Sequence, residues 1–241
     1  AIHLPMVVGP IAIAYNVDGV KDLQLKPATL AKIFAGAVTK WNDPLVKADN
    51  PSATLPATAI LAVHRSDSSG TTDNFTGYLT SAAGSDWTAG KDKVWKAAGG
   101  QGEKGSDGVA GAVKRTPGAI GYVEWSYAQL NSLDVAKVYN GANEFTTLNG
   151  TSAGKAIAGA QVTGAGDDLK LKIDYKTTEA GAYPIVLVAY EIVCSKGNPA
   201  DKLALLKGFL GYTASTTGQG QLEKLGYAPL PETLRAKVEA A

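Results

Sequence analysis

The chain contains few of the residues from which most reactive sites are built. Its 241 residues include one cysteine and two histidines. Cys194 cannot form an internal disulfide, and His3 and His64 lie too far apart in the sequence to suggest a metal-ligand set. We predict that Cys194 is a buried small side chain at the end of a strand; the alternative is a disulfide to a cysteine outside these residues.

An excess of one charge and long apolar runs are also missing. The net charge of +1 gives no field that would attract nucleic acid or an anionic membrane, so we expect neither as a partner. No run approaches the roughly 18–20 apolar residues of a membrane span. The chain begins with Ala1 and shows no signal-peptide pattern. Any anion binding must therefore depend on local groups.

Arginine is scarce, with three residues against twenty lysines, and one of the three has a distinctive setting. Arg65 follows the apolar run 60–63, which predicts a buried strand. After a turn of hydroxyl residues, Phe75, Tyr78 and Leu79 have the spacing of one helix face, which predicts a helix over 70–81.

This strand, turn and helix would suit an anion. The first N–H groups of a helix and the positive end of its dipole favour negative charge. Ser69 either caps the helix or donates to a ligand, Thr71 adds a hydroxyl, and Gly70 permits close approach. Arg65 offers a planar fork of donors, oriented by Asp67. The alternative is an ordinary capped turn with a surface Arg65–Asp67 ion pair.

Two enzymatic interpretations are weaker. His64, Asp67 and Ser69 lie close in sequence, but catalytic triads are not built from one local cluster, and the G-x-S-x-G elbow is missing. The glycine-rich segment 99–105, expected to be a mobile loop, is followed by Ser106 where a phosphate-cradling P-loop has lysine. We therefore predict neither catalysis nor nucleotide binding.

The remaining periodicity predicts alternating strands and helices, and hence an α/β fold with mixed sheets. We expect a strand over 6–17 broken at Gly9-Pro10, and a central strand over 183–193 buried on both faces. An amphipathic helix over 199–212 would be capped by Asn198. The other expected elements are helices over 27–35, 107–114, 126–133, 222–225 and 232–239, and a strand over 119–123.

The segment Arg65-x-Asp67-x-Ser69-Gly70-Thr71 resembles the second anion-binding loop of the high-affinity phosphate-binding proteins of phosphate ABC transporters. Further segments resemble that family in the same order along essentially the whole chain: 34–36, 40–44, 50–51, 55–56, 105–109, 115–124, 183–185 and 225–231. The family's first anion loop and a proton-accepting aspartate precede the point that matches Ala1. We therefore expect this sequence to be the C-terminal majority of such a protein.

The resemblance implies a two-lobed, type II periplasmic-binding-protein-like fold with hinge crossovers, one lobe being incomplete here. Residues 10–184 would form one lobe; residues 1–9 and 185–241 would belong to the other. It also implies a non-enzymatic, monomeric substrate-binding protein without metal or cofactor. That protein would lie in the periplasm, or be secreted or held at the cell surface as a lipoprotein, and would deliver inorganic phosphate to a membrane permease.

Arg65, Ser69, Gly70 and Thr71 are the predicted phosphate-binding residues, with Asp67 supporting Arg65. The alternatives are a phosphate-ester hydrolase and a binder of another tetrahedral oxyanion such as sulfate. Asp67, the one carboxylate near the loop in sequence, is expected to serve Arg65. The sequence therefore assigns no residue of this chain to the choice between phosphate and sulfate.

Overall fold

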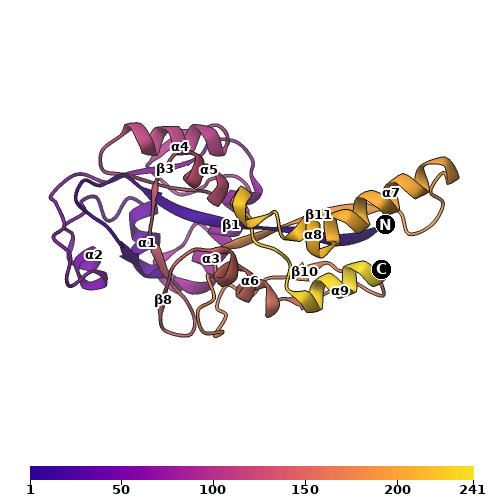
Figure 1. The fold of residues 1–241 in the computed structure, drawn as a ribbon. Helices are drawn as coiled ribbons and strands as arrows, with labels where there is room; N and C mark the ends of the chain where they lie inside the picture. Colours follow the sequence, from indigo (N-terminus) through magenta and orange to yellow (C-terminus); the bar gives the residue numbers. More distant parts are fainter.

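A single long strand, β1 (Ile2–Tyr15), runs from the N-terminus into the larger part of the molecule in the computed structural model, which describes residues 1–241 (Figure 1). Its first part pairs antiparallel with β11 (Val186–Val193), and its second part pairs antiparallel with β5 (Ala119–Glu124). The partner changes between Pro10, which faces Val186, and Ile11, which faces Glu124.

The predicted break at Gly9-Pro10 is therefore wrong, because β1 continues through both residues. Pro10 occupies the last pair of the β11 ladder, a position that tolerates a missing N–H. Gly9 allows β11 to approach closely, since a Cβ there would stand 2.8 Å from Cδ1 of Leu187. A one-residue irregularity at Met6 also fits within the strand, and the Met6 carbonyl accepts a bond from buried Gln219 at 2.9 Å.

The main sheet has the order β11-β1-β5-β3-β4, and β6 (Asp134–Val135) also pairs with β1. Strand β3 (Leu61–Arg65) is parallel to both β5 and β4 (Gln101–Glu103). The predicted α/β fold with mixed sheets is confirmed. The segment 99–105 is not wholly a loop, because β4 forms within it and extends the sheet.

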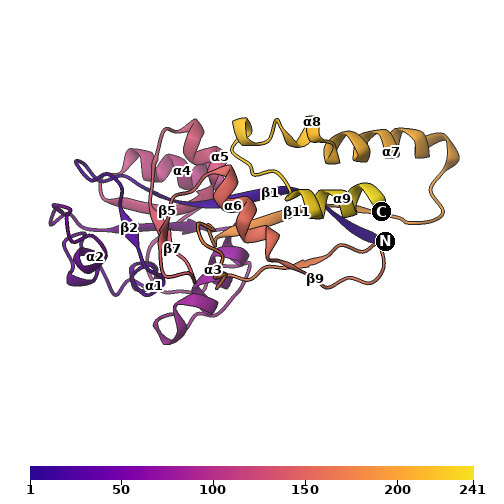
Figure 2. The same ribbon diagram turned by 60° about the horizontal axis from the view of Figure 1, so that its bottom comes forward.

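Helices and a small three-stranded sheet surround the β5–β3 part of the main sheet (Figures 1 and 2). Aromatic side chains fill the space beneath α3, where the ring of Phe75 lies 4.8 Å from Phe34 and 4.5 Å from Tyr122. The helices here are α1 (Pro27–Phe34), α2 (Pro44–Asp49), α3 (Gly70–Ala82), η1 (Gly84–Asp86), α4 (Gly105–Arg115), α5 (Trp125–Leu130) and α6 (Gly150–Ala158). The small sheet here is β2 (Gln24–Leu25) with β7 (Lys137–Tyr139) and β8 (Phe145–Thr146). The hairpin of β9 (Gln161–Val162) and β10 (Leu171–Lys172) lies instead beside the first part of β1 and β11, where the Leu171 N–H donates to Oη of Tyr190 (Figure 2).

The other end of the molecule is a narrow extension that carries both chain ends (Figures 1 and 2). We call it the arm: the first part of β1, β11, and the C-terminal helices. These helices are α7 (Ala200–Ala214), α8 (Thr216–Gln219), η2 (Glu223–Leu225) and α9 (Glu232–Ala240). No helix of the structure has the length and apolarity to cross a membrane.

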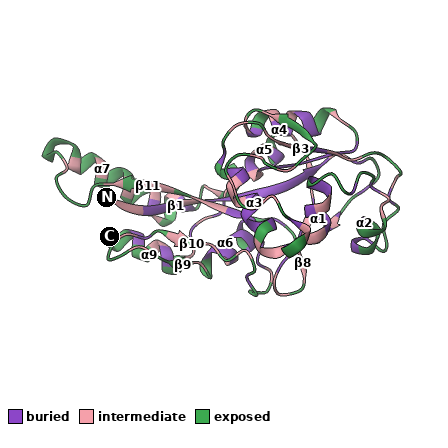
Figure 3. Cartoon of the chain, turned by 180° about the vertical axis from the view of Figure 1, so that it is seen from behind, coloured by how far each residue is buried: buried purple, intermediate pink, exposed green.

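Burial in the arm differs from the sequence predictions (Figure 3). Strand β11 is an edge strand with half-exposed and exposed residues, so the prediction of a central strand buried on both faces is wrong. In α7 only Ala214 is buried, while Leu205 is 77% and Phe209 53% exposed. The helix therefore has apolar residues without the buried face that was predicted.

Two local predictions near the start of α7 are also wrong. Cys194 is exposed, and it follows the end of the edge strand β11. Pro199 takes the N-cap position that was assigned to Asn198, whose side-chain amide donates instead to the Cys194 carbonyl at 2.7 Å.

Candidate anion-binding site

The carboxyl ends of three neighbouring strands meet at one edge of the main sheet. Strand β3 ends at Arg65, β4 ends at Glu103 and β5 ends at Glu124. Arg65 and Glu103 are paired in register, and both β4 and β5 run parallel to β3. Ligands of α/β proteins bind at such edges, beyond the carboxyl ends of parallel strands.

The Arg65 guanidinium is held in one orientation by Asp67. Its Nε and one Nη donate to the two carboxylate oxygens of Asp67, each at 2.7 Å, and the other Nη donates to Oγ of Ser106 at 3.3 Å. The Arg65 side chain is only 12% exposed. The bonds to Asp67 raise the pKa of Arg65, and the negative charges of Asp67 and Glu124 raise it further. Arg65 is therefore a fixed and permanently charged donor.

Asp67 also connects the loop to the start of α4. Its Oδ1, already bound to Arg65, accepts a bond from the backbone N–H of Gly105 at 3.2 Å. The Arg65 bonds, followed by this backbone bond, hold the pKa of Asp67 well below its usual range. Both carboxylate oxygens thus accept hydrogen bonds, and the first turn of α4 is brought beside Arg65.

Ser69 caps helix α3. Its Oγ accepts bonds from the N–H groups of Thr71 at 3.0 Å and Thr72 at 3.4 Å, which is the first of the two roles that the sequence allowed. The Ser69 N–H donates to the Lys93 carbonyl at 2.9 Å, so the loop over 88–100 fixes the turn from outside. Gly70 is exposed, and as the first helical residue its N–H has no partner within the helix.

The strand behind the turn is fixed by a buried tyrosine. Oη of Tyr122, on β5, accepts the Arg65 N–H at 3.1 Å and lies 2.7 Å from Oγ1 of Thr72. Burial raises the pKa of Tyr122, so its hydroxyl stays protonated. One hydroxyl therefore connects β5, the end of β3 and the first turn of α3.

His64 takes no part in this cluster. Its ring stacks on Trp95, with ring centres 4.8 Å apart and planes inclined by 10°, and its Nδ1 lies 3.0 Å from the Arg65 carbonyl oxygen. Neighbouring residues of a strand point to opposite faces, which places the His64 and Arg65 side chains on different sides of β3. No Ser–His–Asp arrangement is assembled, because Ser69 and Asp67 bond instead to α3 and to Arg65.

Two further polar residues of the site were missed from the sequence. Ser106 contacts Arg65, and Oε1 of Glu124 accepts a bond from Oγ1 of Thr71 at 3.4 Å. Ser106 and Glu124 lie in the segments 105–109 and 115–124, which carry the family resemblance. That resemblance was the sequence signal from which both residues could have been identified as part of the site. Their approach to the loop depends on the pairing of β3 with β5 and on the packing of α4.

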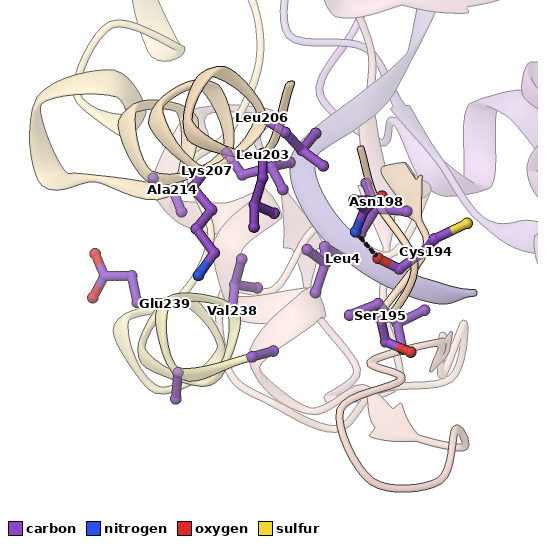
Figure 4. A pocket seen from close by; sticks show the side chains of 16 residues that line it. Leu4, Cys194, Ser195, Asn198, Leu203, Leu206, Lys207, Ala214, Val238 and Glu239 are labelled. Atoms are coloured by element: carbon purple, nitrogen blue, oxygen red, sulfur yellow. Dashed lines mark hydrogen bonds between the residues drawn. The ribbon is translucent and has the colours of Figure 1, made fainter. Parts of the chain in front are cut away.

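A cavity of about 430 Å³ lies in the arm and shares no residue with the loop over 65–71 (Figure 4). It is enclosed by β1, the end of β11, α7 and α9, and apolar side chains such as Leu203, Leu206 and Val238 make up most of its lining. Lys207 is the one cation among its lining residues. This cavity lacks the convergent donors that an anion requires.

Together, the long shared strand, the mixed sheet and the polar loop at its carboxyl edge define a periplasmic-binding-protein-like α/β fold. Residues 1–217 match the family model of the PBP superfamily domain, and the chain belongs to this superfamily.

Proteins with similar sequences are named as phosphate-binding proteins. The chain is 45% identical over 244 residues to phosphate-binding protein PstS 3 of Mycobacterium leprae, and 42% identical over 241 residues to PstS 2 of Mycobacterium tuberculosis. Each alignment covers 99% of this chain and 65% of the relative, so the chain spans slightly less than two thirds of their length.

Solved structures show the same fold. The structure of the high-affinity periplasmic phosphate-binding protein PfluDING, bound with phosphate, has a TM-score of 0.76 at 24% identity and covers 99% of this chain and 70% of its own. A human phosphate-binding apolipoprotein has a TM-score of 0.72 at 22% identity, with coverage of 99% and 72%.

Proposed function

We propose that this chain is part of an extracytoplasmic substrate-binding protein that captures inorganic phosphate and delivers it to an ABC transporter. The observation that carries the proposal is the Arg65 guanidinium, held by Asp67 beside the first turns of α3 and α4. A fixed guanidinium and helix N-termini match the geometry and charge of a tetrahedral oxyanion. The mycobacterial relatives, named as phosphate-binding proteins, support the choice of phosphate.

In this proposal, Arg65, the Gly70 N–H and the Thr71 hydroxyl bind the ligand. Ser69 contributes through the cap that orders the helix N-terminus, since its Oγ already accepts two N–H bonds. Asp67 holds Arg65. Charge-assisted bonds of this kind are stronger than neutral ones, above all where water is excluded.

We also propose that two lobes close on the ligand, with residues 10–184 in one lobe and residues 1–9 and 185–241 in the other. The exchange of β1 partners between Pro10 and Ile11 supports this division, as does the start of β11 at Val186. In this role the protein acts as a monomer outside the cytoplasm and docks on a membrane permease.

Calorimetric titration with phosphate tests the function. The titration should be carried out on the 241-residue chain and on the longest natural form that contains it. We call the unsubstituted protein the parent. We expect Arg65→Ala to weaken binding by about 2–5 kcal/mol, because it removes one partner of a desolvated charge pair. Arg115→Ala, which removes an exposed arginine at the end of α4, is the matched control and should bind as the parent does.

Two results would contradict the proposal. One is equal phosphate affinity in the parent and in Arg65→Ala. The other is turnover of a chromogenic phosphate ester by the parent but not by Arg65→Ala, which would identify a hydrolase. A preference for sulfate over phosphate would keep the anion site but change its ligand.

A further inference from the structure

A segment of the arm reaches from α8 towards α5 and α6 before the chain returns to α9 (Figure 2). We call this segment, residues 220–229, the strap; it includes η2. Its two ends are joined by Gln219, whose Oε1 accepts the N–H of Leu230 at 2.7 Å and whose Nε2 donates to the Met6 carbonyl at 2.9 Å. Near the second end, Ala228 exchanges two backbone hydrogen bonds with the first part of β1. The base of the strap is therefore fixed to the arm.

The far end of the strap lies directly on α5, in the larger part of the molecule. Gly226 follows η2 in the left-handed conformation, with a φ of +78°. A Cβ added to Gly226 would stand 2.5 Å from Cα and 2.7 Å from the backbone nitrogen of Ser126, so the two backbones meet closely. Both the dihedral angle and this approach require glycine. Because Ser126 comes two positions after Glu124, the contact lies beside the carboxyl edge that carries the candidate site.

A second contact joins the strap to α6. The side chain of Glu223, in η2, lies against Gly150, the first residue of α6. A Cβ added to Gly150 would stand 2.8 Å from Oε1 of Glu223. The positive end of a helix dipole favours a carboxylate at this position. The strap thus contacts the first turns of two helices of the larger part, while its base belongs to the arm.

The contact with α5 also buries a polar group that has no partner. Ser126 is 9% exposed, and its Oγ makes no hydrogen bond with any protein group. A buried hydroxyl of this kind opposes the conformation that buries it, because water can bond to it when it is uncovered. The packing of Gly226 and the charge of Glu223 therefore favour the docked strap, whereas the hydroxyl of Ser126 disfavours it.

We propose that the strap is a reversible clasp between the arm and the larger part of the molecule. Docked on α5 and α6, it holds the arm beside the candidate site; released, it lets the arm rotate away. Its effect on the ligand rests on the phosphate-binding function proposed above. A docked strap slows the opening of the two lobes, and the departure of phosphate depends on that opening.

The orientation of the arm is measured without phosphate, in the 241-residue chain. Spin labels on Cys194, exposed after β11, and on Lys114→Cys, exposed on α4, report the distance between the arm and the larger part by pulsed electron paramagnetic resonance. We expect Gly226→Ala to broaden the distribution of this distance, and Ser126→Ala to leave it as narrow as in the parent or narrower. Gly197→Ala is the matched control, since Gly197 has the same φ of +78° but no atom within 4 Å of an added Cβ. It should leave the distribution unchanged.

The effect on phosphate is the rate at which the radiolabelled ion dissociates from the longest natural form. We expect Gly226→Ala to speed dissociation roughly tenfold, which corresponds to about 1.4 kcal/mol of docking. Glu223→Gln should speed it by a smaller factor. Ser126→Ala should slow dissociation several-fold, because it removes the hydroxyl that opposes docking. General destabilisation of the fold does not produce opposite changes at the two sides of one contact, and thermal unfolding of each variant checks its folding.

Three results would overturn the inference while the phosphate-binding function stands. The first is equal dissociation from the parent and Gly226→Ala. The second is slower release from Gly226→Ala and faster release from Ser126→Ala, which would show that the strap opposes closure. The third is a Gly197→Ala protein that behaves as Gly226→Ala does, which would make backbone strain the cause. If the parent binds no phosphate, the proposed function fails, and the distance distributions alone decide whether the strap is a clasp.

Discussion

The hydroxyl groups of Thr72 and Tyr122 lie 2.7 Å apart in the interior, and both side chains are fully buried. The Tyr122 hydroxyl also accepts the N–H of Arg65. The residue that carries the positive charge of the candidate site is therefore fixed from behind by a group that never reaches the ligand. The loop is held in place before any anion arrives.

Removing this hydroxyl should weaken both folding and binding. We expect Tyr122→Phe to lower the free energy of unfolding by about 1–3 kcal/mol, because it leaves the Arg65 N–H and the Thr72 hydroxyl without a partner. Phosphate affinity should fall as well. Urea unfolding and calorimetry measure the two effects.

Tyr183→Phe is the control for this experiment. It removes an equally buried hydroxyl that makes no contact with the loop. The Tyr183 hydroxyl donates to the Ile11 carbonyl at a distance of 2.8 Å. It should cost similar stability and leave phosphate affinity nearly unchanged. Equal losses of affinity in both variants would contradict the specific role of Tyr122.

Asp67 should make stability depend on pH. Its folded-state pKa is lowered, chiefly by the bonds from Arg65 and then by the Gly105 N–H. A lowered carboxyl pKa contributes stability that is present above the unfolded-state value of about 3.9 and is lost as the pH falls through the folded-state pKa.

We therefore expect Asp67→Asn to be less stable than the parent near neutral pH. The difference in unfolding free energy should shrink as the pH falls from about 5 to about 2, since the parent then loses the same interaction. Urea unfolding of both proteins across this pH range measures the difference. The contributions of the other carboxylates to the pH dependence cancel, because both proteins contain them. A constant difference at every pH would be inconsistent with the Asp67–Arg65 pair as its source.

Gly70 allows stability and binding to be separated. A Cβ added there meets no atom within 4 Å, so the fold has room for a side chain. We expect Gly70→Ala to keep or raise stability by up to about 1 kcal/mol, because alanine is the better helix former. Phosphate affinity should nevertheless fall, since the new methyl group stands where the ligand approaches the N–H.

Gly118→Ala is the comparison variant, because the fold has no room for a side chain at that position. Its φ is +84°, and a Cβ would collide with the Ala59 carbonyl oxygen, so this substitution should destabilise the fold. Calorimetry and thermal unfolding of both variants provide the data. A Gly70→Ala protein that binds phosphate as well as the parent would remove Gly70 from the site.

Trp95 should report the state of the loop. Its ring stacks on His64, which in turn contacts the Arg65 carbonyl oxygen. We expect phosphate to change the tryptophan fluorescence of the parent and not that of Trp95→Phe. Trp41→Phe, which removes a fully buried tryptophan bonded to the Gly118 carbonyl, should retain the change. A signal that persists in Trp95→Phe and disappears in Trp41→Phe would refute the assignment.

Local patterns in the sequence were sufficient to predict much of the loop. An apolar run predicted β3, and the spacing of Phe75, Tyr78 and Leu79 predicted α3, which extends from Gly70 to Ala82. Proximity in sequence also suggested the contact between Arg65 and Asp67. These features depend on neighbouring residues, so their physical causes are present in a short segment.

Contacts between distant segments could not be predicted in this way. Ser106 reaches Arg65 across 41 positions, and Glu124 reaches Thr71 across 53, because strand pairing brings these residues to one edge. The arm shows the same limit for burial. The apolar residues of β11 and α7 indicate burial, but their exposure depends on what packs against them.

The uninterrupted course of β1 limits how the arm can move. Each residue from Ile2 to Pro10, apart from the irregularity at Met6, faces β11, and each from Ile11 to Tyr15 faces β5. No unpaired residue separates the two ladders, so no single pair of dihedral angles can serve as a pivot. A change of angle between the arm and the rest of the molecule must instead be spread as a gradual change of strand twist over several residues, which favours small rotations over a wide swing.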